Sequence, residues 1–227
     1  MKIKSRSWAG RFIINPALIV LVSGLLQASI AFGEETVFIG QFSKSDLKDW
    51  EIKEFKDKNT YSIVSVEGKT VLKTESNGTA SAFYKTVEID LKRTPYLNWS
   101  WKVENIFPDL DEQTKDGDDF PARVYVVVSS GFAFWKTKAI NYVWSSNNPV
   151  GDYWPNPFTN NVIMVPLQSG VDKINTWTKE KRNVREDLIE FLGIEALTLD
   201  GVAVMTDTDN SNGKAVAYYG DVYFTSE

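Results

Sequence analysis

The chain has 227 residues and a formal charge of −5, and it contains no cysteine and no histidine. These absences exclude a Ser-His-Asp triad, a cysteine nucleophile, a disulfide and an ordinary zinc site, and the acidic balance argues against nucleic acid as a partner. Acid–base chemistry would therefore fall to carboxylates, Lys or Tyr, and a bound metal would be an oxygen-liganded ion such as Ca²⁺.

Residues 1–33 have the pattern of a secretory signal peptide. A basic start without acids is followed by the mostly apolar stretch Phe12–Phe32 and the small-x-small pattern Ala31-Phe32-Gly33. We expect cleavage near Gly33, no membrane span in the mature protein, and a periplasmic or secreted location in a bacterium, since an exported domain without disulfides suits the periplasm. The alternative is an uncleaved anchor, but the unbroken apolar part is short for a bilayer span.

Residues 34–227 are then predicted to form a single domain large enough for a substantial core. The removed segment holds four bases and no acid, so its loss takes the formal charge from −5 to −9. Short apolar or alternating segments separated by turn signals predict about ten strands. They are Val37–Phe42, Tyr61–Val66, Val71–Thr74, Ala82–Ile89, Tyr96–Val103, Arg123–Ser129, Ala139–Trp144, Asn161–Pro166, Gly201–Thr206 and Ala215–Phe224.

One helix is predicted between Asn183, which can cap it together with Glu186, and Gly193, which ends it. A second, weaker candidate is Lys44–Lys48. The fold class is therefore all-β: a two-sheet antiparallel β-sandwich with jelly-roll, galactose-binding-like topology and one or two short helices.

The tryptophans allow two interpretations. Exposed indoles can stack on sugars, whereas buried indoles fill a core. In Tyr96–Val103, Trp99 and Trp101 share a face with Leu97 and Val103, which predicts that both are core residues. Trp135 and Trp154 lie in loop-like surroundings, and for them the two interpretations stay open.

An acidic turn precedes one predicted strand. Asp116, Asp118 and Asp119 are crowded together just before Arg123, which shares a strand face with Tyr125. A buried Arg needs a carboxylate partner, so either an Arg–Asp clamp or a ligand site is expected here. The preceding acids, Asp109 to Glu112, are interpreted as a solvated turn.

A second acidic segment contains Asp207 and Asp209 at alternate positions. It is not an EF-hand, because Gly is absent from the sixth position and Tyr218 occupies the twelfth. A polar hairpin loop is the simple interpretation, and a Ca²⁺ site with one or two carboxylates is the alternative.

Two further segments complete the candidate site. Tyr219 and Asp221 flank Gly220, which indicates a close backbone approach, and Asp221 is expected near the start of the mature chain. The stretch from Asn141 and Trp144 to 159 is rich in Asn, Pro and aromatic residues, as the rim of a groove often is.

Several motifs occur together and in a fixed order. They are Trp99-x-Trp101-Lys-Val, Asp116-x-Asp-Asp-Phe-x-Ala-Arg-Val-Tyr-Val126, Asn141-Tyr-Val-Trp144, Asn156-Pro-Phe-Thr159, Glu180-x-Arg-Asn-Val184, Met205-Thr-Asp-Thr-Asp-Asn210 and Tyr219-Gly-Asp-Val222. In these motifs the chain resembles the exported bacterial family called domain of unknown function 3047. The resemblance implies one exported domain and supplies no catalytic residue.

Two functions fit this sequence. The first is an exported, non-catalytic domain that binds a saccharide or cell-envelope polymer. The second is a glycan hydrolase or lyase that uses two of Asp118, Asp119, Asp207 and Asp221 with Arg123. A purely structural envelope protein is a third class. The predicted ligand-binding residues are Asp116, Asp118, Asp119, Arg123, Asn141, Trp144, Asp207, Asp209, Tyr219 and Asp221.

Overall fold

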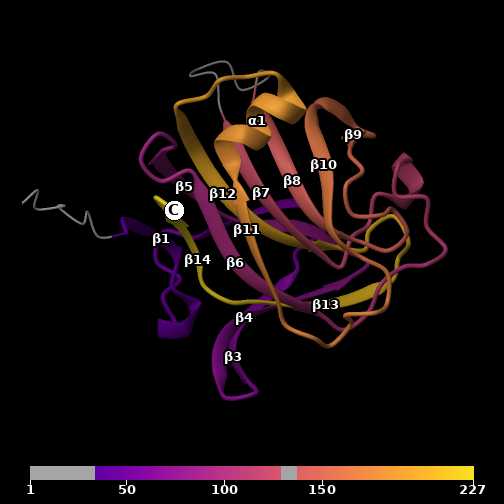
Figure 1. Cartoon of the computed structure of the whole chain (residues 1–227). Helices are drawn as coiled ribbons and strands as arrows, with labels where there is room; N and C mark the ends of the chain where they lie inside the picture. The colour runs from indigo at the N-terminus through magenta and orange to yellow at the C-terminus, as the bar shows by residue number, and fades with distance from the viewer. Residues whose placement is uncertain (1–33, 129–136) are drawn as a thin grey trace, which may run out of the picture. The chain divides into compact units, whose positions relative to one another are not determined.

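The computed structural model describes residues 34–128 and 137–227, which form the predicted two-sheet β-sandwich of jelly-roll type (Figure 1). The predicted signal peptide, 1–33, and Trp135 lie outside the described residues. Sheet A contains β1 (Thr36–Gly40), β3 (Thr60–Val66), β4 (Lys69–Asn77), β6 (Tyr96–Val103), β11 (Thr178–Asn183), β13 (Lys214–Tyr219) and β14 (Val222–Thr225). Sheet B contains, in spatial order, β2 (Glu51–Lys56), β5 (Ala80–Asp90), β12 (Thr198–Asp207), β7 (Ala122–Val128), β8 (Lys138–Ser145), β10 (Thr159–Ser169) and β9 (Trp154–Asn156).

The sheets are antiparallel, as predicted, with one exception among the described strands: β8 and β10 run parallel. A parallel pair needs a crossover of a dozen or more residues, and the connection 146–158 provides it. This connection includes β9, which pairs with the outer side of β10.

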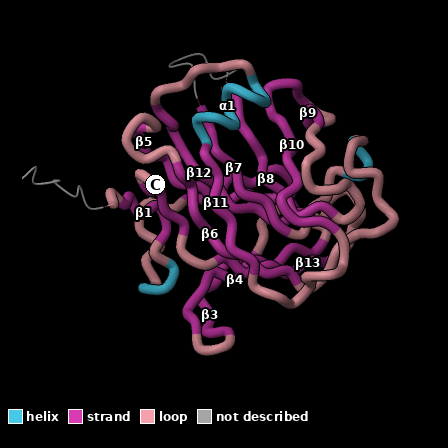
Figure 2. The backbone as a smooth tube through the Cα atoms, viewed as in Figure 1, coloured by secondary structure: helices cyan, strands magenta, loops and turns pink. Residues whose placement is uncertain are grey.

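Helical structure is limited to three short segments in the described chain (Figure 2). The predicted helix is α1 (Val184–Leu192), in which the side chain of Asn183 accepts a hydrogen bond from the Glu186 amide at 3.2 Å and Gly193 ends the helix at φ 64°. The other two are 3₁₀ turns, η1 (Phe42–Lys44) and η2 (Lys115–Gly117). No helix within 34–128 and 137–227 combines the length and the apolarity needed to cross a membrane.

The core lies between the sheets, and the predicted burial of Trp99 and Trp101 is confirmed. Their exposed fractions are 2% and 0%, and their rings meet edge to face with centroids 5.5 Å apart. From sheet B, Tyr142 and Trp144 complete this aromatic layer by contacting Trp99 and Trp101, respectively. Because side chains alternate along a strand, the residues between these core positions in β7, β8 and β12 belong to the opposite face of sheet B.

Gly220 separates β13 from β14 where the backbone passes close to β6. Its amide donates to the Ser100 carbonyl at 2.9 Å, and a Cβ atom at this position would lie 2.3 Å from Oγ of Ser100. The strand that follows, β14, pairs with β1 near the beginning of the described chain. As expected, Asp221 reaches this region: its carboxylate accepts from the Ser43 amide at 2.7 Å and from its hydroxyl at 2.6 Å.

Candidate functional site

The candidate site lies on the face of sheet B that points away from the core. Val124 of β7 and Val204 of β12 are directly paired, and both enter the core. The next pair along these strands, Arg123 and Met205, therefore points to the outer face. The acidic turn 116–119 ends just before β7, which brings its carboxylates to the same end of the strand.

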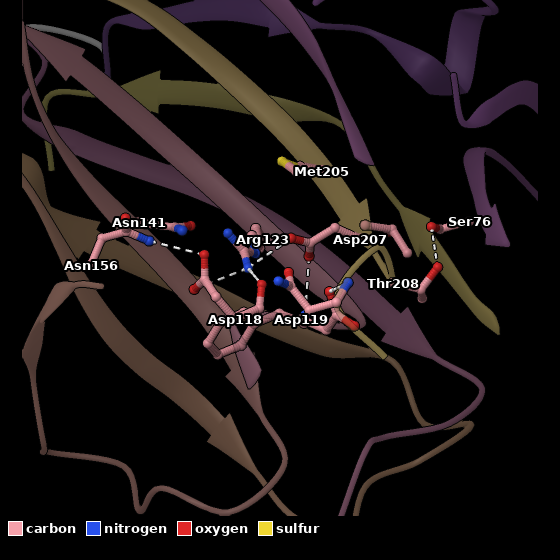
Figure 3. Close-up of polar contacts among 12 residues, drawn as sticks. Ser76, Asp118, Asp119, Arg123, Asn141, Asn156, Met205, Asp207 and Thr208 are labelled. Carbon is pink, nitrogen blue, oxygen red and sulfur yellow. Dashed lines mark hydrogen bonds and ion pairs between the residues drawn. The ribbon is translucent and has the colours of Figure 1, made fainter. Parts of the chain in front are cut away.

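Arg123 is buried between two carboxylates, which are turned toward it in Figure 3. Its Nη2 atom lies 2.8 Å from Oδ2 of Asp207 and 3.3 Å from Oδ1 of Asp118, and all three side chains are at least nine-tenths buried. Nη2 also donates to the carbonyl oxygen of Asp118, and Nη1 donates to the hydroxyl of Tyr125 at 2.9 Å. The expected contact between Arg123 and a nearby acid is thus present.

Phe120 supports this cluster from one side. Its ring centroid lies 4.4 Å from Cζ of Arg123, close enough for a cation–π contact. Its amide donates to Oδ1 of Asp207 at 3.0 Å, so that each oxygen of Asp207 has a partner. The geometry of the guanidinium is therefore fixed by both the turn and β12.

The electrostatics follow from two buried acids sharing a single guanidinium. Burial, reinforced by repulsion from Asp118 and Asp119, raises the pKa of Asp207 well above its ordinary value despite the attraction of Arg123. Burial likewise raises the pKa of Asp118. Burial alone would lower the pKa of Arg123, but the two carboxylates raise it well above its usual value, so Arg123 stays charged. Burial raises the pKa of Tyr125 to about 12, so its hydroxyl stays neutral.

Asp119 ties the turn to the loop after β12. Its two oxygens accept hydrogen bonds from the amides of Asn210, at 3.1 Å, and Ser211, at 2.6 Å. Oxygens of Asp119, Asp207 and Asp209 lie within 4.8 Å of one another, as the oxygen ligands of a cation do. These three carboxylates do not fit Ca²⁺ well. The oxygens of Asp119 already accept hydrogen bonds from backbone amides, and Oδ2 of Asp207 already contacts Arg123, so few oxygens remain free to bind the ion.

A cavity of ≈ 370 Å³ opens over this cluster. Arg123 and Asp118 line it, and the side-chain amide of Asn156 donates to Oδ2 of Asp118 at 3.1 Å. Phe55 of β2 and Phe158 of the β9–β10 turn also line it, and they are 64% and 58% exposed. Because β2 and the β10–β9 pair lie at opposite edges of sheet B, the cavity extends across the sheet.

The structure brings only part of the predicted set to this cavity. Asp118, Arg123 and Asp209 line it, and Asp119 and Asp207 support them. Asp116 is exposed on η2 and does not line the cavity. Asn141 is on the outer face but fully buried, and its amide contacts the sulfur of Met164 at 3.3 Å.

Three predicted residues lie elsewhere. Trp144 is a core residue on the inner face of sheet B, where strand alternation directs it. Tyr219 is also in the core, but its hydroxyl accepts from the Arg123 amide at 3.1 Å and donates to the Met205 carbonyl at 2.8 Å, so it holds β7 and β12 together behind the site. Asp221 is held by Ser43 beside β1 and β14, in sheet A, and lines a different cavity.

The interpretation of Asp109 to Glu112 as a solvated turn is wrong for Glu112, which is fully buried. Its carboxylate accepts from the hydroxyl of Ser145, the amide of Ser146 and the side chain of Asn148. Glu112 thereby anchors the acidic loop to the turn after β8, and its three donors compensate its burial.

Three apolar residues that line the cavity were not predicted from the sequence: Phe55, Val162 and Met205. Asn156 and Phe158, in contrast, belong to the stretch that was predicted to form the rim of a groove. Phe55 could not be predicted as a lining residue, because its strand, β2, was not predicted.

A family model described as "Protein of unknown function (DUF3047)" matches residues 48–223. A comparison with curated proteins found no match. Among solved structures, the family 30 carbohydrate-binding module of a Clostridium thermocellum cellulosomal cellulase is 11% identical with a TM-score of 0.39, and the alignment covers 78% of this chain and 87% of that one. Endoglucanase cel12A from Rhodothermus marinus is 9% identical with a TM-score of 0.44, covering 85% and 98%. The enzymatically active domain of bacteriophage CBA120 tailspike protein 4 is 12% identical with a TM-score of 0.39, covering 83% of this chain but 21% of that one. These likenesses concern the fold alone.

Proposed function

The chain belongs to the DUF3047 family of proteins of unknown function, and we propose that it is an exported, non-catalytic domain that binds a saccharide or a cell-envelope polymer. Export to the periplasm or the cell exterior is supported by the basic start, the apolar stretch and the small-x-small pattern of residues 1–33. The mass of the protein isolated from the periplasm would test it: we expect residues 1–33 to be missing, and a retained N-terminus would contradict export with cleavage.

The observation that carries the binding proposal is the cavity across sheet B. It combines two exposed rings, Phe55 and Phe158, with a polar floor formed by Arg123 and Asp118. A sugar ring has apolar C–H faces and a polar edge, so it can stack on such rings while its hydroxyls bond to the floor.

The ion pairs favour binding over catalysis. A glycoside hydrolase needs two carboxyl groups that face the substrate. Asp118 and Asp207 instead contact the same nitrogen of Arg123, and Asp119 bonds to backbone amides. The fourth candidate, Asp221, lies at the other sheet. One observation supports a hydrolase or lyase as the second candidate: Asp118 and Asp209 both line the cavity, and burial raises the pKa of each.

A saccharide array that includes bacterial envelope polymers would test binding with the purified protein. We expect Phe55→Ala and Phe158→Ala to weaken binding at least about tenfold and to change stability little, because both rings are mainly exposed. Phe38→Ala is the matched control, since Phe38 is a 48% exposed ring on β1 of sheet A. Equal losses in all three variants, or no binding by the wild type, would contradict the proposal.

The same array hits serve to test the second candidate. Each bound polymer would be incubated with the wild type and with Asp118→Asn, and new chain ends would be measured. We expect no product from either protein. Product formed by the wild type and lost in Asp118→Asn would replace the binding proposal with the enzymatic one.

A further inference from the structure

The guanidinium of Arg123 is at the bottom of the cavity, where an Arg ordinarily indicates a carboxylate or phosphate ligand. Here its charge is already compensated. Asp207 and Asp118 both contact Nη2, at 2.8 and 3.3 Å, and Nη1 is bonded to Tyr125. The cluster carries no net positive charge even when one of the two acids holds a proton. The two parallel hydrogen bonds that an Arg offers to an anion are thus not available.

What remains is one donor and one acceptor. The Nε–H group of Arg123 has no hydrogen-bond partner within the described part of the chain, and Oδ1 of Asp118, which lies 3.3 Å from Nη2 in the ion pair, accepts no hydrogen bond there. Both residues line the cavity, and both side chains are more than nine-tenths buried. A buried polar group that lacks a hydrogen bond is unfavourable, so each of these atoms favours a ligand that supplies one.

We propose that this cavity selects neutral, hydroxyl-rich saccharides and discriminates against uronic acids and other carboxylate-bearing sugars. The inference rests on the proposed function. A hydroxyl group both accepts and donates, so one hydroxyl can accept from Nε of Arg123 and donate to Oδ1 of Asp118. A carboxylate can accept from Nε, but it has no proton for Asp118 and would bring a second negative charge beside it.

The rest of the lining agrees with this selection. Asp209 adds another acid to the wall, and the other lining residues are mostly apolar. Two bases lie near the rim: Lys56, whose Nζ donates to the Asp209 carbonyl at 2.8 Å, and Lys115, whose Nζ lies 5.5 Å from the ring centroid of Phe158. Since both are exposed and screened by water, we expect the buried floor to dominate.

The test uses sugars that differ only in the oxidation of C6. β-1,4-Linked hexamers of glucose, galactose and mannose are each paired with the corresponding hexamer of glucuronic, galacturonic and mannuronic acid. Binding is measured by titration calorimetry at neutral pH and low salt. In every pair that binds, we expect the neutral member to bind at least about tenfold more tightly. The repulsion between two like charges in a buried site is larger than the free energy that corresponds to a tenfold difference in affinity.

Asp118→Asn removes the repelling charge and leaves Asp207 to compensate Arg123. We expect the preference for the neutral member to fall at least about tenfold, mainly through tighter binding of the acid. Asp116→Asn is the matched control, because it removes the same charge from an exposed residue of the same turn, and the preference should not change. A second measurement needs no variant: NaCl is raised from about 0.02 M to about 0.5 M with the wild type. Because salt screens the repulsion, the acidic hexamer should bind more tightly, and the affinity for the neutral hexamer should not change.

The outcomes separate this inference from the proposed function. If array hits exist but the acidic member binds equally or more tightly, or if salt weakens it, the charge selection is wrong and binding itself survives. An unchanged preference in Asp118→Asn would equally refute the role of Asp118. If no neutral or acidic saccharide binds in the array or the titrations, the proposed function fails and this inference fails with it.

Discussion

Replacing Arg123 with Met would remove the cation that two buried carboxylates share. Met keeps much of the volume of the side chain, so the variant tests the charge rather than the packing. Asp207 is 4% exposed and does not line the cavity, so it cannot reach water without opening β12, whereas Asp118 borders the cavity but is only 7% exposed. We expect the variant to be destabilised by about 3–5 kcal/mol at pH 7, as when one partner of a buried ion pair is removed.

The size of this destabilisation should depend on pH, because the unpaired carboxyl group can take up a proton. An unpaired carboxyl can escape its charge by taking up a proton, and each pH unit above its ordinary pKa of 3.8 makes this about 1.4 kcal/mol more costly. At pH 7 the proton costs about 4 kcal/mol, and at pH 5 about 1.5 kcal/mol. The destabilisation of Arg123→Met should therefore shrink between pH 7 and pH 5.

Urea unfolding of the wild type and the variant at the two pH values would measure this difference. At pH 7 the melting temperature should also fall by about 6–20 °C for a protein of this size. Lys102→Met is the matched control, because Lys102 is also buried, at 8% exposed, and also pairs with an acid. Its partner Glu67 is 58% exposed and stays hydrated without Lys102, so the free energy of unfolding should change by less than about 1 kcal/mol. If Arg123→Met resembles this control, or if its destabilisation is the same at both pH values, the argument from buried charge is wrong.

Three further predictions concern the core, Asp207 and cations. Trp101→Ala should destabilise the protein by about 3–5 kcal/mol in urea unfolding, because Trp101 is fully buried; a near-normal midpoint would contradict this packing. Since the folded pKa of Asp207 is raised, the stability that its proton contributes is present below pH 3.8 and is lost as the pH rises through the folded pKa. In unfolding measurements from pH 4 to 7, the wild type should thus lose stability relative to Asp207→Asn as the pH rises. The opposite trend would refute the raised pKa. Millimolar CaCl₂ should leave the melting temperature unchanged, because the oxygens of Asp119 are already bonded; a rise of several degrees would reveal a cation site.

Each strand in the middle of a sheet overlaps a predicted strand, as do the edge strands β1 and β3 of sheet A, whereas three strands were missed. These are β2, β9 and β11, and each pairs with a single neighbouring strand. An edge strand is partly held by backbone hydrogen bonds and can be polar on both faces, so its sequence need not alternate. In β2, for example, only Ile52 is partly buried. The parallel pairing of β8 with β10 was also missed, because it depends on the path of the crossover rather than on either strand.

For the site, the sequence predicted the Arg–carboxylate cluster because a buried Arg requires a partner and the acidic turn precedes it directly. The sequence could not show that Asp207, and not Asp221, contacts Arg123, because this depends on which sheet each of their strands joins. Placing both Asn141 and Trp144 in the site was an avoidable error. They are three residues apart in one strand and so must point to opposite faces. Phe55 was beyond reach, because its position depends on how an unpredicted edge strand borders the cavity.

The pairing of β1 with β14 has a consequence for the order of events when the protein is made. β14 bonds to both β1 and β6, so sheet A is incomplete until some of the last residues of the described chain leave the ribosome. Contacts so distant in sequence slow folding, because the long intervening loop must close first. A nascent chain of this kind remains unfolded for longer, which would leave more time for the proposed export to begin before the domain has folded.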